Sequence, residues 1–378
     1  MSPEQTLPVT DSTDVLVVGA GVVGLSVARA LARRGLEVIL VERHRRVGEE
    51  TSSRNSGVIH SGIYYPTASA KARLCVRGRD LLYRYCEDKG IAHRRCGKII
   101  VAQASETEKL RGLWQQARAN GVTDLAWLDA AQVRELEPEV RCEAALLCPS
   151  TGIIDVHEYM TALHGDLEHH EGSVVFDTEL VSAGSTAEGF RVELRAGQER
   201  SHIDCRWLVN AAGLHAVELL RRTAGFPAAA IPRSYFAKGN YFDCVGASPF
   251  RRLVYPMPAS AGLGIHATLD LAGKVRFGPD VEWIDALDYS VDAARASQFY
   301  LAIRTYWPAL RDGALAPSYA GIRPKLAAAG EPAADFRIDT PRQHGVSGLV
   351  NLLGIESPGL TASLAIGDYV SEQLAGKS

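Results

Sequence analysis

The sequence lacks the features of an integral membrane protein. It contains no run of about 18 apolar residues, so it predicts no transmembrane segment. Residues 1–13 have no apolar core, so we expect no signal peptide. Peripheral contact with the inner face of a membrane is the one membrane association that this pattern leaves open.

An excess of one charge sign is also missing. The 41 Lys and Arg residues stand against 44 Asp and Glu residues, and the net charge is −3. Such a balance creates no global field that would attract nucleic acid or an anionic surface. We therefore expect no nucleic-acid partner, and any site for an anion has to be local.

Cysteine pairs at metal-binding or redox spacing are absent. The number of cysteines is odd, and none of them form a Cys-x-x-Cys motif. Reduced thiols in a reducing compartment explain this pattern best, so we expect a cytoplasmic protein without a metal site. The cysteines are Cys75, Cys86, Cys96, Cys142, Cys148, Cys205 and Cys244.

The clearest feature that is present is a βαβ pattern at the start of the chain. The β-branched run over 14–18 predicts a buried parallel strand, and the small and apolar residues over 25–34 predict a packed helix. Gly35 ends this helix, and 36–41 predicts a second strand. This order is typical of the first unit of a dinucleotide-binding domain.

A Gly-x-Gly-x-x-Gly motif joins the first strand to the helix. Gly19 permits the tight turn, Gly21 lets the backbone approach a pyrophosphate, and Gly24 lets the helix pack closely on the strand. The pyrophosphate is expected at the helix N-terminus. Glu42, at the end of the second strand, can accept hydrogen bonds from ribose hydroxyls and repels a 2′-phosphate, which disfavours NADP.

A second polar segment favours FAD over NAD. Residues 51–57, Thr-Ser-Ser-Arg-Asn-Ser-Gly, are rich in small hydrogen-bonding side chains. A flavin with its ribityl chain and pyrophosphate has a use for such a loop, whereas NAD does not. The run 208–213 ends in small residues and resembles the second nucleotide-contacting strand of flavoproteins with two dinucleotide folds.

The remaining pattern is mixed. Helices are predicted over 68–89, 106–120, 156–169, 293–306 and 360–374, and strands over 98–102, 174–176, 190–194, 207–209 and 348–353. Alternation over 233–277 predicts an antiparallel sheet with turns at Lys238-Gly239 and Ala272-Gly273. At 378 residues the chain is long enough for two lobes, so we expect a parallel nucleotide layer interrupted by an antiparallel layer.

Seven short motifs extend along most of the chain. They are Asn55-Ser-Gly-Val-Ile-His60-Ser-Gly-Ile-Tyr64-Tyr65, Lys71-Ala-Arg-Leu-Cys75, Cys96-Gly-Lys-Ile-Ile-Val-Ala102, Thr151-Gly-Ile-Ile-Asp155, Asn210-Ala-Ala-Gly213-Leu-His215, Tyr255-Pro-Met-Pro258 and Gly264-Ile-His266. Together they resemble the D-amino-acid-oxidase superfamily of FAD oxidoreductases, and within it the L-2-hydroxyglutarate dehydrogenases and oxidases.

The resemblance implies an α/β fold with α+β character. A Rossmann-type FAD-binding domain of the glutathione-reductase-like family is expected over 14–84, 152–226 and 318–378, and a mostly antiparallel substrate domain over 85–151 and 227–317. The implied reaction oxidises a small 2-hydroxy acid, with L-2-hydroxyglutarate the leading candidate, to the 2-oxo acid by hydride transfer to flavin N5. The electron acceptor that follows is oxygen, a quinone or another flavoprotein.

The motifs and the resemblance together predict the FAD contacts. The residues are Gly19, Gly21, Val22, Val23, Gly24, Glu42, Arg43, Thr51, Ser52, Ser53, Asn55, Ser56, Gly57, Val58, His60, Val181, Ala211, Ala212, Gly213, Arg323, Pro358, Gly359, Leu360 and Thr361. The segment 354–361 is expected to cap the flavin pyrimidine, where free N–H groups stabilise negative charge on the reduced flavin.

The catalytic roles fall on histidines and an arginine. His60 is the first candidate for the base that takes the hydroxyl proton, and a covalent tether to FAD or a plain hydrogen bond are its other interpretations. His266 is the alternative base. Arg323 is the candidate clamp for the substrate carboxylate, because a guanidinium can grip it with two hydrogen bonds. Lys238 and Tyr255 are weaker candidates for the wall of the site.

A five-carbon diacid needs a second cation, and Lys238 or Lys325 could supply it. Two motifs depart from the pattern of the L-2-hydroxyglutarate enzymes. They are Gly321-Ile-Arg323-Pro324-Lys325, which keeps the arginine, and Leu353-Gly354-Ile-Glu356-Ser357-Pro358-Gly359-Leu360-Thr361, which keeps a Ser-Pro-x-x-Thr pattern; the residues around both differ. Amino-acid or amine oxidation, glycerol-3-phosphate oxidation and non-catalytic flavin binding stay as alternatives. Tyr64 weakens the glycerol-3-phosphate alternative, since that group has an arginine there.

Overall fold

A parallel layer forms the centre of one lobe. The computed structural model describes residues 11–258 and 264–375. β1 (Asp11–Val18) pairs in parallel with β2 (Val38–Val41) and β12 (Glu199–Asn210), and β9 (Ser173–Val175) and β21 (Leu349–Leu353) extend the layer on either side. The layer is built from short runs of mostly apolar, β-branched residues, which suits strands that are covered on both faces.

Antiparallel strands complete this first sheet. The first half of β12 pairs with β11 (Phe190–Ala196), which pairs with β10 (Thr178–Ser185). β13 (Thr223–Ala224) lies beside β10, and β20 (Arg337–Asp339) lies beside β21. The long β12 therefore belongs to the nucleotide layer at its end and to an antiparallel arm at its start.

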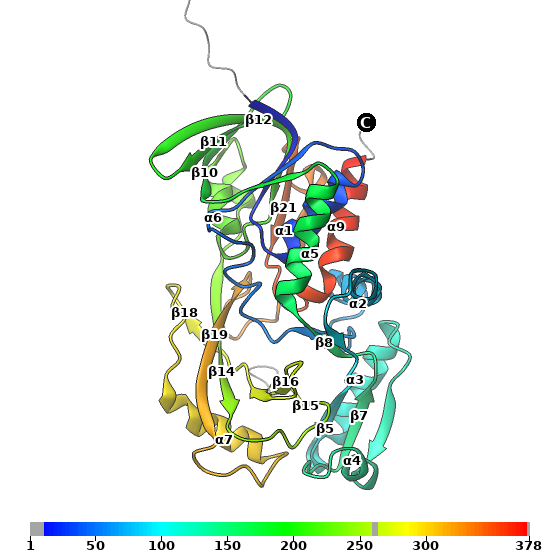
Figure 1. Cartoon of the computed structure of the whole chain (residues 1–378). Coiled ribbons are helices and arrows are strands. Elements are labelled where there is room, and N and C mark those ends of the chain that lie inside the picture. Colours follow the sequence, from blue (N-terminus) through cyan, green and yellow to red (C-terminus); the bar gives the residue numbers. More distant parts are fainter. Residues whose placement is uncertain (1–10, 259–263, 376–378) are drawn as a thin grey trace, which may run out of the picture.

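Helices cover the parallel layer. α1 (Val22–Ala32) packs against α5 (Val156–His169) and α9 (Gly359–Ala375), and α2 (Ala70–Lys89) packs against α9 (Figure 1). Their apolar residues form one buried core with β1 and β2. A second core lies between the antiparallel arm and α6 (Ala216–Arg221).

The second lobe is built on another sheet. Its strand order is β18-β14-β17-β16-β15-β5-β7-β6, with β19 beside β14. The strands are β5 (Lys98–Ala102), β6 (Ala126–Asp129), β7 (Ala144–Cys148), β14 (Tyr235–Cys244), β15 (Leu253–Pro256), β16 (Ala267–Leu269), β17 (Val275–Phe277), β18 (Glu282–Ile284) and β19 (Leu315–Lys325). The long pair β14 and β19 runs from the first lobe into the second (Figure 1).

Smaller elements complete the fold. A small sheet of β3 (Val58–Ile59), β8 (Gly152–Ile154) and β4 (His93–Arg94) lies between the lobes (Figure 1). The other helices are α3 (Thr107–Ala119), α4 (Ala130–Leu136), α7 (Ala296–Arg304) and α8 (Pro341–His344), with 3₁₀ turns η1 (Ala104–Glu106), η2 (Gly213–His215), η3 (Ala228–Ala230) and η4 (Ala293–Arg295).

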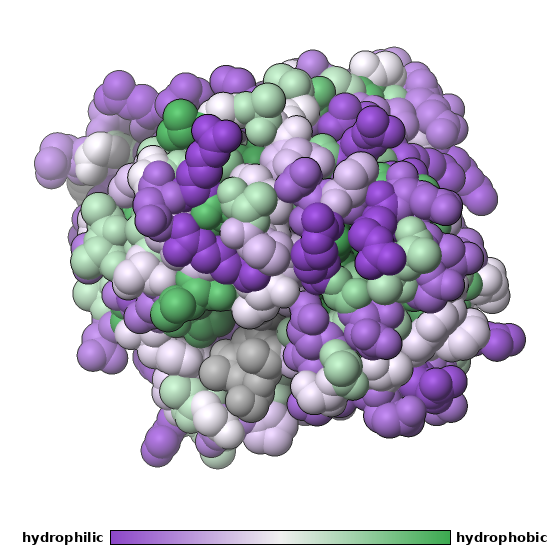
Figure 2. Space-filling model, turned by 90° about the horizontal axis from the view of Figure 1, so that it is seen from below, coloured by the Kyte–Doolittle hydropathy of each residue, from purple (hydrophilic) through white to green (hydrophobic). Residues whose placement is uncertain are grey.

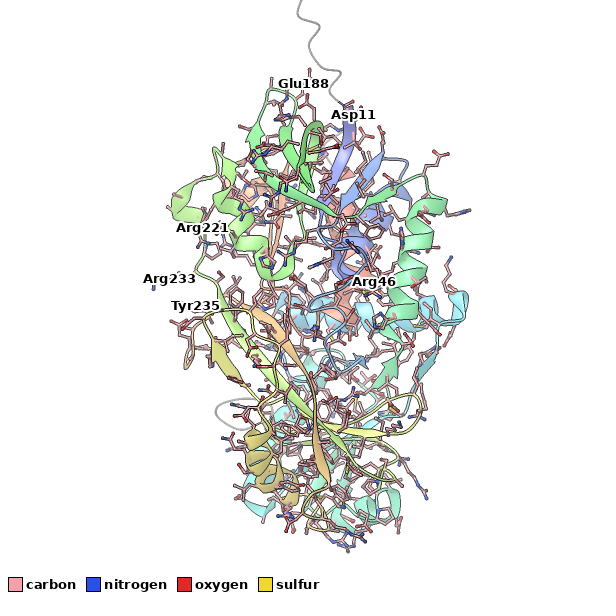
Figure 3. All side chains as sticks on the ribbon, turned by 60° about the vertical axis from the view of Figure 1, so that its left-hand side comes forward. Asp11, Arg46, Glu188, Arg221, Arg233 and Tyr235 are labelled. Carbon is pink, nitrogen blue, oxygen red and sulfur yellow. The ribbon has the colours of Figure 1, made fainter. Side chains whose placement is uncertain are left out.

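The face of the molecule that Figure 2 shows has no large apolar patch. Seen from the end of the second lobe, polar residues cover most of the molecule and apolar side chains form separate spots (Figure 2). Tyr235, at the start of β14, lies at the waist between the lobes, and Asp11 and Glu188 mark the far end of the first lobe (Figure 3). Among the described residues, no helix combines the length and apolarity needed to cross a membrane.

The expected fold class is confirmed, with two local corrections. β1 begins at Asp11 rather than residue 14, because its first residues pair with Ile203 and the residues after it on β12. The turn predicted at Lys238-Gly239 is wrong, since β14 runs straight through both residues. Gly239 lies where Pro279 approaches the strand, and a Cβ there would come within 2.6 Å of the proline ring. The glycine therefore marks close packing and not a turn. The residue boundaries of the two lobes stay predictions.

Candidate active site

The glycine motif forms the turn between β1 and α1. Gly19 has φ +104°, and a Cβ on Gly24 would lie 1.9 Å from the Gly19 carbonyl oxygen. The helix can therefore start against the strand only if both residues are glycine. Gly21 precedes the first turn of α1, and the N–H of Val22 donates to Ser52 Oγ at 3.0 Å. The N-terminus of α1 opens on a long cavity between the lobes.

Glu42 lies on the wall of the same cavity, at the end of β2. Its Oε2 accepts a hydrogen bond from the N–H of Ala20 at 2.8 Å, and its Oε1 accepts one from the N–H of His44 at 2.9 Å. These bonds fix the carboxylate while leaving further lone pairs for a ribose. The position therefore fits the role that the sequence predicted for Glu42.

A cluster of charges lies at the rim of this end. Arg43 forms an ion pair with Glu50, and its guanidinium lies 2.7 Å from His215 Nε2. Burial raises the pKa of Glu50, but the bonds and charges of His215 and Arg43 outweigh it and hold the pKa at about 2. The cluster joins the loop after β2 to the turn after β12.

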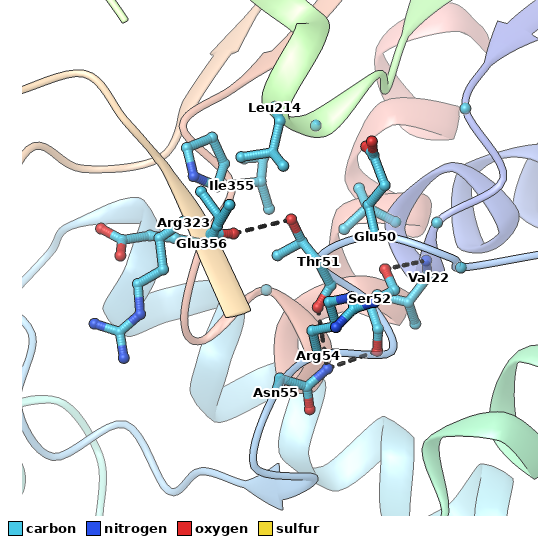
Figure 4. A pocket seen from close by; sticks show the side chains of 18 of the residues that line it. Val22, Glu50, Thr51, Ser52, Arg54, Asn55, Leu214, Arg323, Ile355 and Glu356 are labelled. Carbon is cyan, nitrogen blue, oxygen red and sulfur yellow. Dashed lines mark hydrogen bonds between the residues drawn. The ribbon is translucent and has the colours of Figure 1, made fainter. Parts of the chain in front are cut away.

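The polar loop over 51–57 borders the middle of the cavity. Thr51 Oγ1 donates to the carbonyl of Ile322 on β19 at 3.0 Å, and Asn55 Nδ2 donates to the carbonyl of Ser52 at 2.6 Å (Figure 4). Tyr319 donates its hydroxyl hydrogen to the carbonyl of Asn55 at 2.6 Å. The loop is thus attached to β19, the strand that carries Arg323.

The start of α9 closes the cavity on another side. Pro358, Gly359 and Leu360 line it, and α9 begins at Gly359. Thr361 holds the neighbouring loop: its Oγ1 accepts from the N–H of His60 at 2.9 Å and donates to the carbonyl of Val58 at 3.2 Å. The N-terminus of this 17-residue helix therefore adds a positive dipole end to the cavity wall.

His60 lies where the nucleotide half of the cavity meets the second lobe. Its Nε2 is 3.4 Å from Ser357 Oγ, and its Nδ1 is buried without a hydrogen-bond partner among the described residues. Burial, and then the charges of Lys98 and Arg323, lower the pKa of His60 to about 3. The imidazole is therefore neutral at physiological pH, the form in which one ring nitrogen has a free lone pair.

Two further predicted residues form one wall of the cavity. The rings of Tyr255 and His266 stack with centroids 3.5 Å apart and an interplanar angle of 8°. Both side chains are almost completely buried, and both line the cavity. His266 lies one residue before β16 rather than within a strand.

Arg323 lies opposite, on β19, and extends away from Thr51 and its neighbours (Figure 4). Within the described part of the chain, no carboxylate lies within 4.0 Å of its guanidinium. Its recorded side-chain partner is the hydroxyl of Tyr241, which also lies 3.0 Å from Ser56 Oγ. A half-buried guanidinium without an acidic partner is suited to bind a carboxylate ligand.

The two lysines proposed from the sequence are placed differently. Lys238 is buried outside the cavity, 2.8 Å from Asp288 and 4.0 Å from Glu282. Lys325 is 2.7 Å from Glu356, which also pairs with Lys71 at 3.1 Å. Because each of the two lysines already contacts a carboxylate, which Lys325 shares with Lys71, we assign them to the fold and not to the substrate.

The cavity brings most of the predicted FAD contacts together. Gly24, Ser53, Gly57, Val181 and Thr361 are the predicted residues that do not line it. Leu180 lines it in place of Val181, and Gly24 and Thr361 support residues that do. Residues that the sequence did not single out are Glu50, Arg54, His215, Tyr241, Ser357 and, behind the wall, Lys98.

The size and the lining of the cavity fit a bound dinucleotide. It encloses about 1940 Å³, counting its open mouth, and extends from the glycine turn to His60 and Arg323. Backbone N–H groups of α1, a fixed carboxylate and an unpartnered imidazole nitrogen lie along it. These are the groups that a pyrophosphate, a ribose and a flavin with bound substrate require.

Comparison with known proteins identifies the family. The model of the family described as FAD dependent oxidoreductase (DAO) matches residues 14–373. The chain belongs to this family. It is therefore an FAD-dependent oxidoreductase, and the cofactor and enzyme class predicted from the sequence are confirmed.

Individual relatives agree with this assignment. A protein from Arabidopsis thaliana named L-2-hydroxyglutarate dehydrogenase, mitochondrial, is 41% identical over 96% of this chain and 83% of its own length. A protein from Salmonella houtenae named L-2-hydroxyglutarate dehydrogenase is 27% identical over 94% of this chain and 92% of its own length. The resemblance to the L-2-hydroxyglutarate dehydrogenases that the sequence motifs indicated is confirmed.

Solved structures share the fold. L-α-glycerophosphate oxidase from Mycoplasma pneumoniae, solved with FAD bound, is 25% identical with a TM-score of 0.87 over 98% of this chain and 96% of its own. Glycine oxidase from Geobacillus kaustophilus is 20% identical with a TM-score of 0.82 over the same shares of the two chains. Both structures thus share the fold of this chain over almost its whole length.

Proposed function

We propose that this flavoenzyme oxidises L-2-hydroxyglutarate to the 2-oxo acid. The names of the relatives favour this substrate over others in the family. The observation that carries the proposal is Arg323, a guanidinium without an acidic partner among the described residues, in the same cavity as the neutral imidazole of His60. A 2-hydroxy acid needs both a carboxylate clamp and a proton acceptor.

The residues of the chain divide the work as follows. The glycine turn, Glu42 and the polar loop would hold FAD, which when bound supplies the acceptor for the two electrons. Arg323 binds the C1 carboxylate and thereby orients C2 and its hydroxyl. His60 takes the hydroxyl proton.

His60 is preferred to His266 as the base because of its free nitrogen. Nδ1 of His60 is buried and has no partner among the described residues, as expected for an atom that a ligand completes. The ring of His266, in contrast, stacks flat on Tyr255 and forms a wall. We assign His266 to shaping the site.

Anaerobic flavin bleaching tests the proposal. The holoenzyme is mixed with L-2-hydroxyglutarate, D-2-hydroxyglutarate, glycerol 3-phosphate and a panel of amino acids. We expect rapid bleaching by L-2-hydroxyglutarate alone. Bleaching by glycerol 3-phosphate or an amino acid in its place would overturn the substrate assignment while leaving the cofactor untouched.

Arg323 is tested in the same assay. We expect Arg323→Ala to lower kcat/KM on the order of 10²- to 10³-fold, the cost of removing one partner of a buried charge pair. Arg323→Lys keeps the charge but not the planar fork, so it should recover part of the loss. Equal rates in wild type and Arg323→Ala would remove the clamp from the proposal.

The acceptor that re-oxidises the enzyme is a separate measurement. Oxygen, a soluble quinone and an electron-transferring flavoprotein are offered to the reduced enzyme, and the fastest re-oxidation identifies the acceptor class.

A further inference from the structure

A second buried cation, Lys98, lies beside the site. It stands within the motif over 96–102, but no role was predicted for it. Lys98 is the first residue of β5, and 1% of its surface is exposed. Its ammonium nitrogen lies 4.7 Å from the ring centroid of Tyr64 and 4.8 Å from that of Tyr255. Within the described residues, no carboxylate lies within 4.0 Å of it, in contrast to Lys71, Lys238 and Lys325.

The two tyrosine rings attract the ammonium of Lys98 but do not neutralise its charge. An aromatic face attracts a cation through its quadrupole, but it carries no net negative charge. Buried charges in proteins are normally paired, because an isolated charge in a low dielectric is costly. A buried ammonium that lies over two tyrosine rings, with no carboxylate within 4.0 Å among the described residues, is therefore short of one negative charge.

The charge of Lys98 acts on residues that line the active site. Tyr255, one of its two aromatic neighbours, lines the cavity and carries the stacked His266. The charges of Lys98 and Arg323 both lower the pKa of His60, after burial. The region around His60 thus contains two positive charges, Arg323 and Lys98, and among the described residues no carboxylate lies within 4.0 Å of either. The carboxylate that lines the cavity there, Glu356, pairs with Lys71 and Lys325 and acts on Arg323 from a longer distance.

We propose that Lys98 is a specificity residue that makes this site select 2-hydroxy acids with a second anionic group. The inference rests on the proposed function and deepens it. Arg323 neutralises the C1 carboxylate, and the field of Lys98, acting across the Tyr255 wall, favours a second carboxylate at the far end of the substrate. A monocarboxylic substrate leaves the charge of Lys98 unbalanced.

The matched pair of substrates is L-2-hydroxyglutarate and L-2-hydroxyglutaramate, in which an amide replaces the distal carboxylate. Wild type should prefer the diacid. Lys98→Met should lower the ratio of the two kcat/KM values on the order of 10- to 100-fold, chiefly through the diacid, and Lys98→Arg should keep most of the ratio. If Lys98→Met slows both substrates equally, or leaves the ratio intact, the proposal is wrong.

Lys238→Met is the matched control, because Lys238 is also a buried lysine but is neutralised by Asp288. It should leave the substrate ratio at the wild-type value. A fall of the ratio in Lys238→Met as large as in Lys98→Met would overturn the assignment, since the effect would then follow from any buried lysine.

A binding measurement removes the dependence on turnover. Glutarate and its monoamide are titrated into the oxidised holoenzyme, and the change in flavin absorbance gives both dissociation constants. Lys98→Met should bring the two constants together. If wild type turns over neither substrate, the proposed function fails, but selective binding of glutarate would still support Lys98.

Wild type alone provides a test if Lys98→Met does not fold. Burial lowers the pKa of Lys98 to about 8, with Cys148 and Cys75 opposing the shift. The ammonium is thus charged below about pH 8 and neutral above it, and the preference for glutarate should disappear as pH rises from 7 to 9. The other titratable groups around it are Cys75, Cys148, His60, Tyr64 and Tyr255. Burial raises the pKa of Cys75 to about 12 and holds the pKa of both tyrosines well above this range, and His60 is already neutral. A preference unchanged at pH 9 would contradict the proposal.

Discussion

The two ends of the cavity are built in different ways. The nucleotide end consists mainly of backbone: a glycine turn, the first N–H groups of α1 and one carboxylate, all within about 30 residues of sequence. The substrate end consists of side chains from five separate segments: His60, Lys98, Tyr255, His266 and Arg323. We therefore expect a substitution at the nucleotide end to act on cofactor binding and stability, and a substitution at the substrate end to act on the rate. The predictions below test this difference.

The largest effect is expected at the nucleotide end. Gly24→Val places a side chain where even a Cβ would lie 1.9 Å from the Gly19 carbonyl oxygen, so strand and helix must separate. We expect loss of FAD and a fall in stability of about 3 kcal/mol or more, measured by flavin content and denaturant unfolding. Gly112→Ala, on exposed α3 with open space around it, is the control and should be neutral or slightly stabilising. A yellow, stable Gly24→Val protein would show that the turn is not needed.

The second-largest effect is expected at the substrate end, where a substitution should lower kcat without loss of FAD. His60→Gln should lower kcat on the order of 10²- to 10⁴-fold while FAD content stays at the wild-type level. Because the pKa of His60 is lowered to about 3, its neutral form is present throughout pH 5–8. The wild-type pH profile should therefore have no acid limb near pH 6.5, the value of an ordinary histidine. An acid limb there, absent from His60→Gln, would mean that substrate restores the ordinary pKa.

A smaller effect is expected for Glu42→Gln. The amide keeps the shape of the side chain, but only one of its two ends can accept from the N–H groups of Ala20 and His44. We expect FAD to dissociate on the order of tenfold more easily, with kcat unchanged at saturating FAD. A change in kcat at saturating FAD would contradict the separation of the two ends.

The smallest effect is expected for Arg43→Ala at the rim. The Arg43–Glu50 pair is partly exposed, and such pairs contribute roughly 0–1 kcal/mol. The affinity for FAD should fall by no more than about fivefold, and by less at high salt, as measured by fluorescence titration of the apoprotein. A larger loss would make this cluster part of the cofactor site itself.

The difference between the two ends of the cavity explains which parts of the site could be predicted from the sequence. Strand, glycine turn, helix and carboxylate follow one another along the chain, so local patterns predicted the nucleotide end almost completely. Lys98 and Tyr241 reach the site through the pairing of β5 with β15 and of β14 with β19, which no local pattern records. The one available signal for Lys98 was a lysine at the head of an otherwise apolar strand, since lysine is rarely buried without a partner. Lys238, in the middle of β14, and Lys325, at the end of β19, are also lysines in strands, and only the structure shows their carboxylate partners.

The bonds between the 51–57 loop and β19 have a consequence for how the holoenzyme assembles. Thr51 donates to the carbonyl of Ile322 on the strand that carries Arg323, and the carbonyl of Asn55 accepts from the hydroxyl of Tyr319 on the same strand. Ser56 Oγ lies 3.0 Å from the hydroxyl of Tyr241 beside it. A ligand that orders this loop therefore also orders the carboxylate clamp. Linkage makes the relation reciprocal: whatever factor bound FAD adds to the affinity for the acid, the bound acid adds to the retention of FAD. Cells rich in substrate would then keep more of this enzyme in its loaded form.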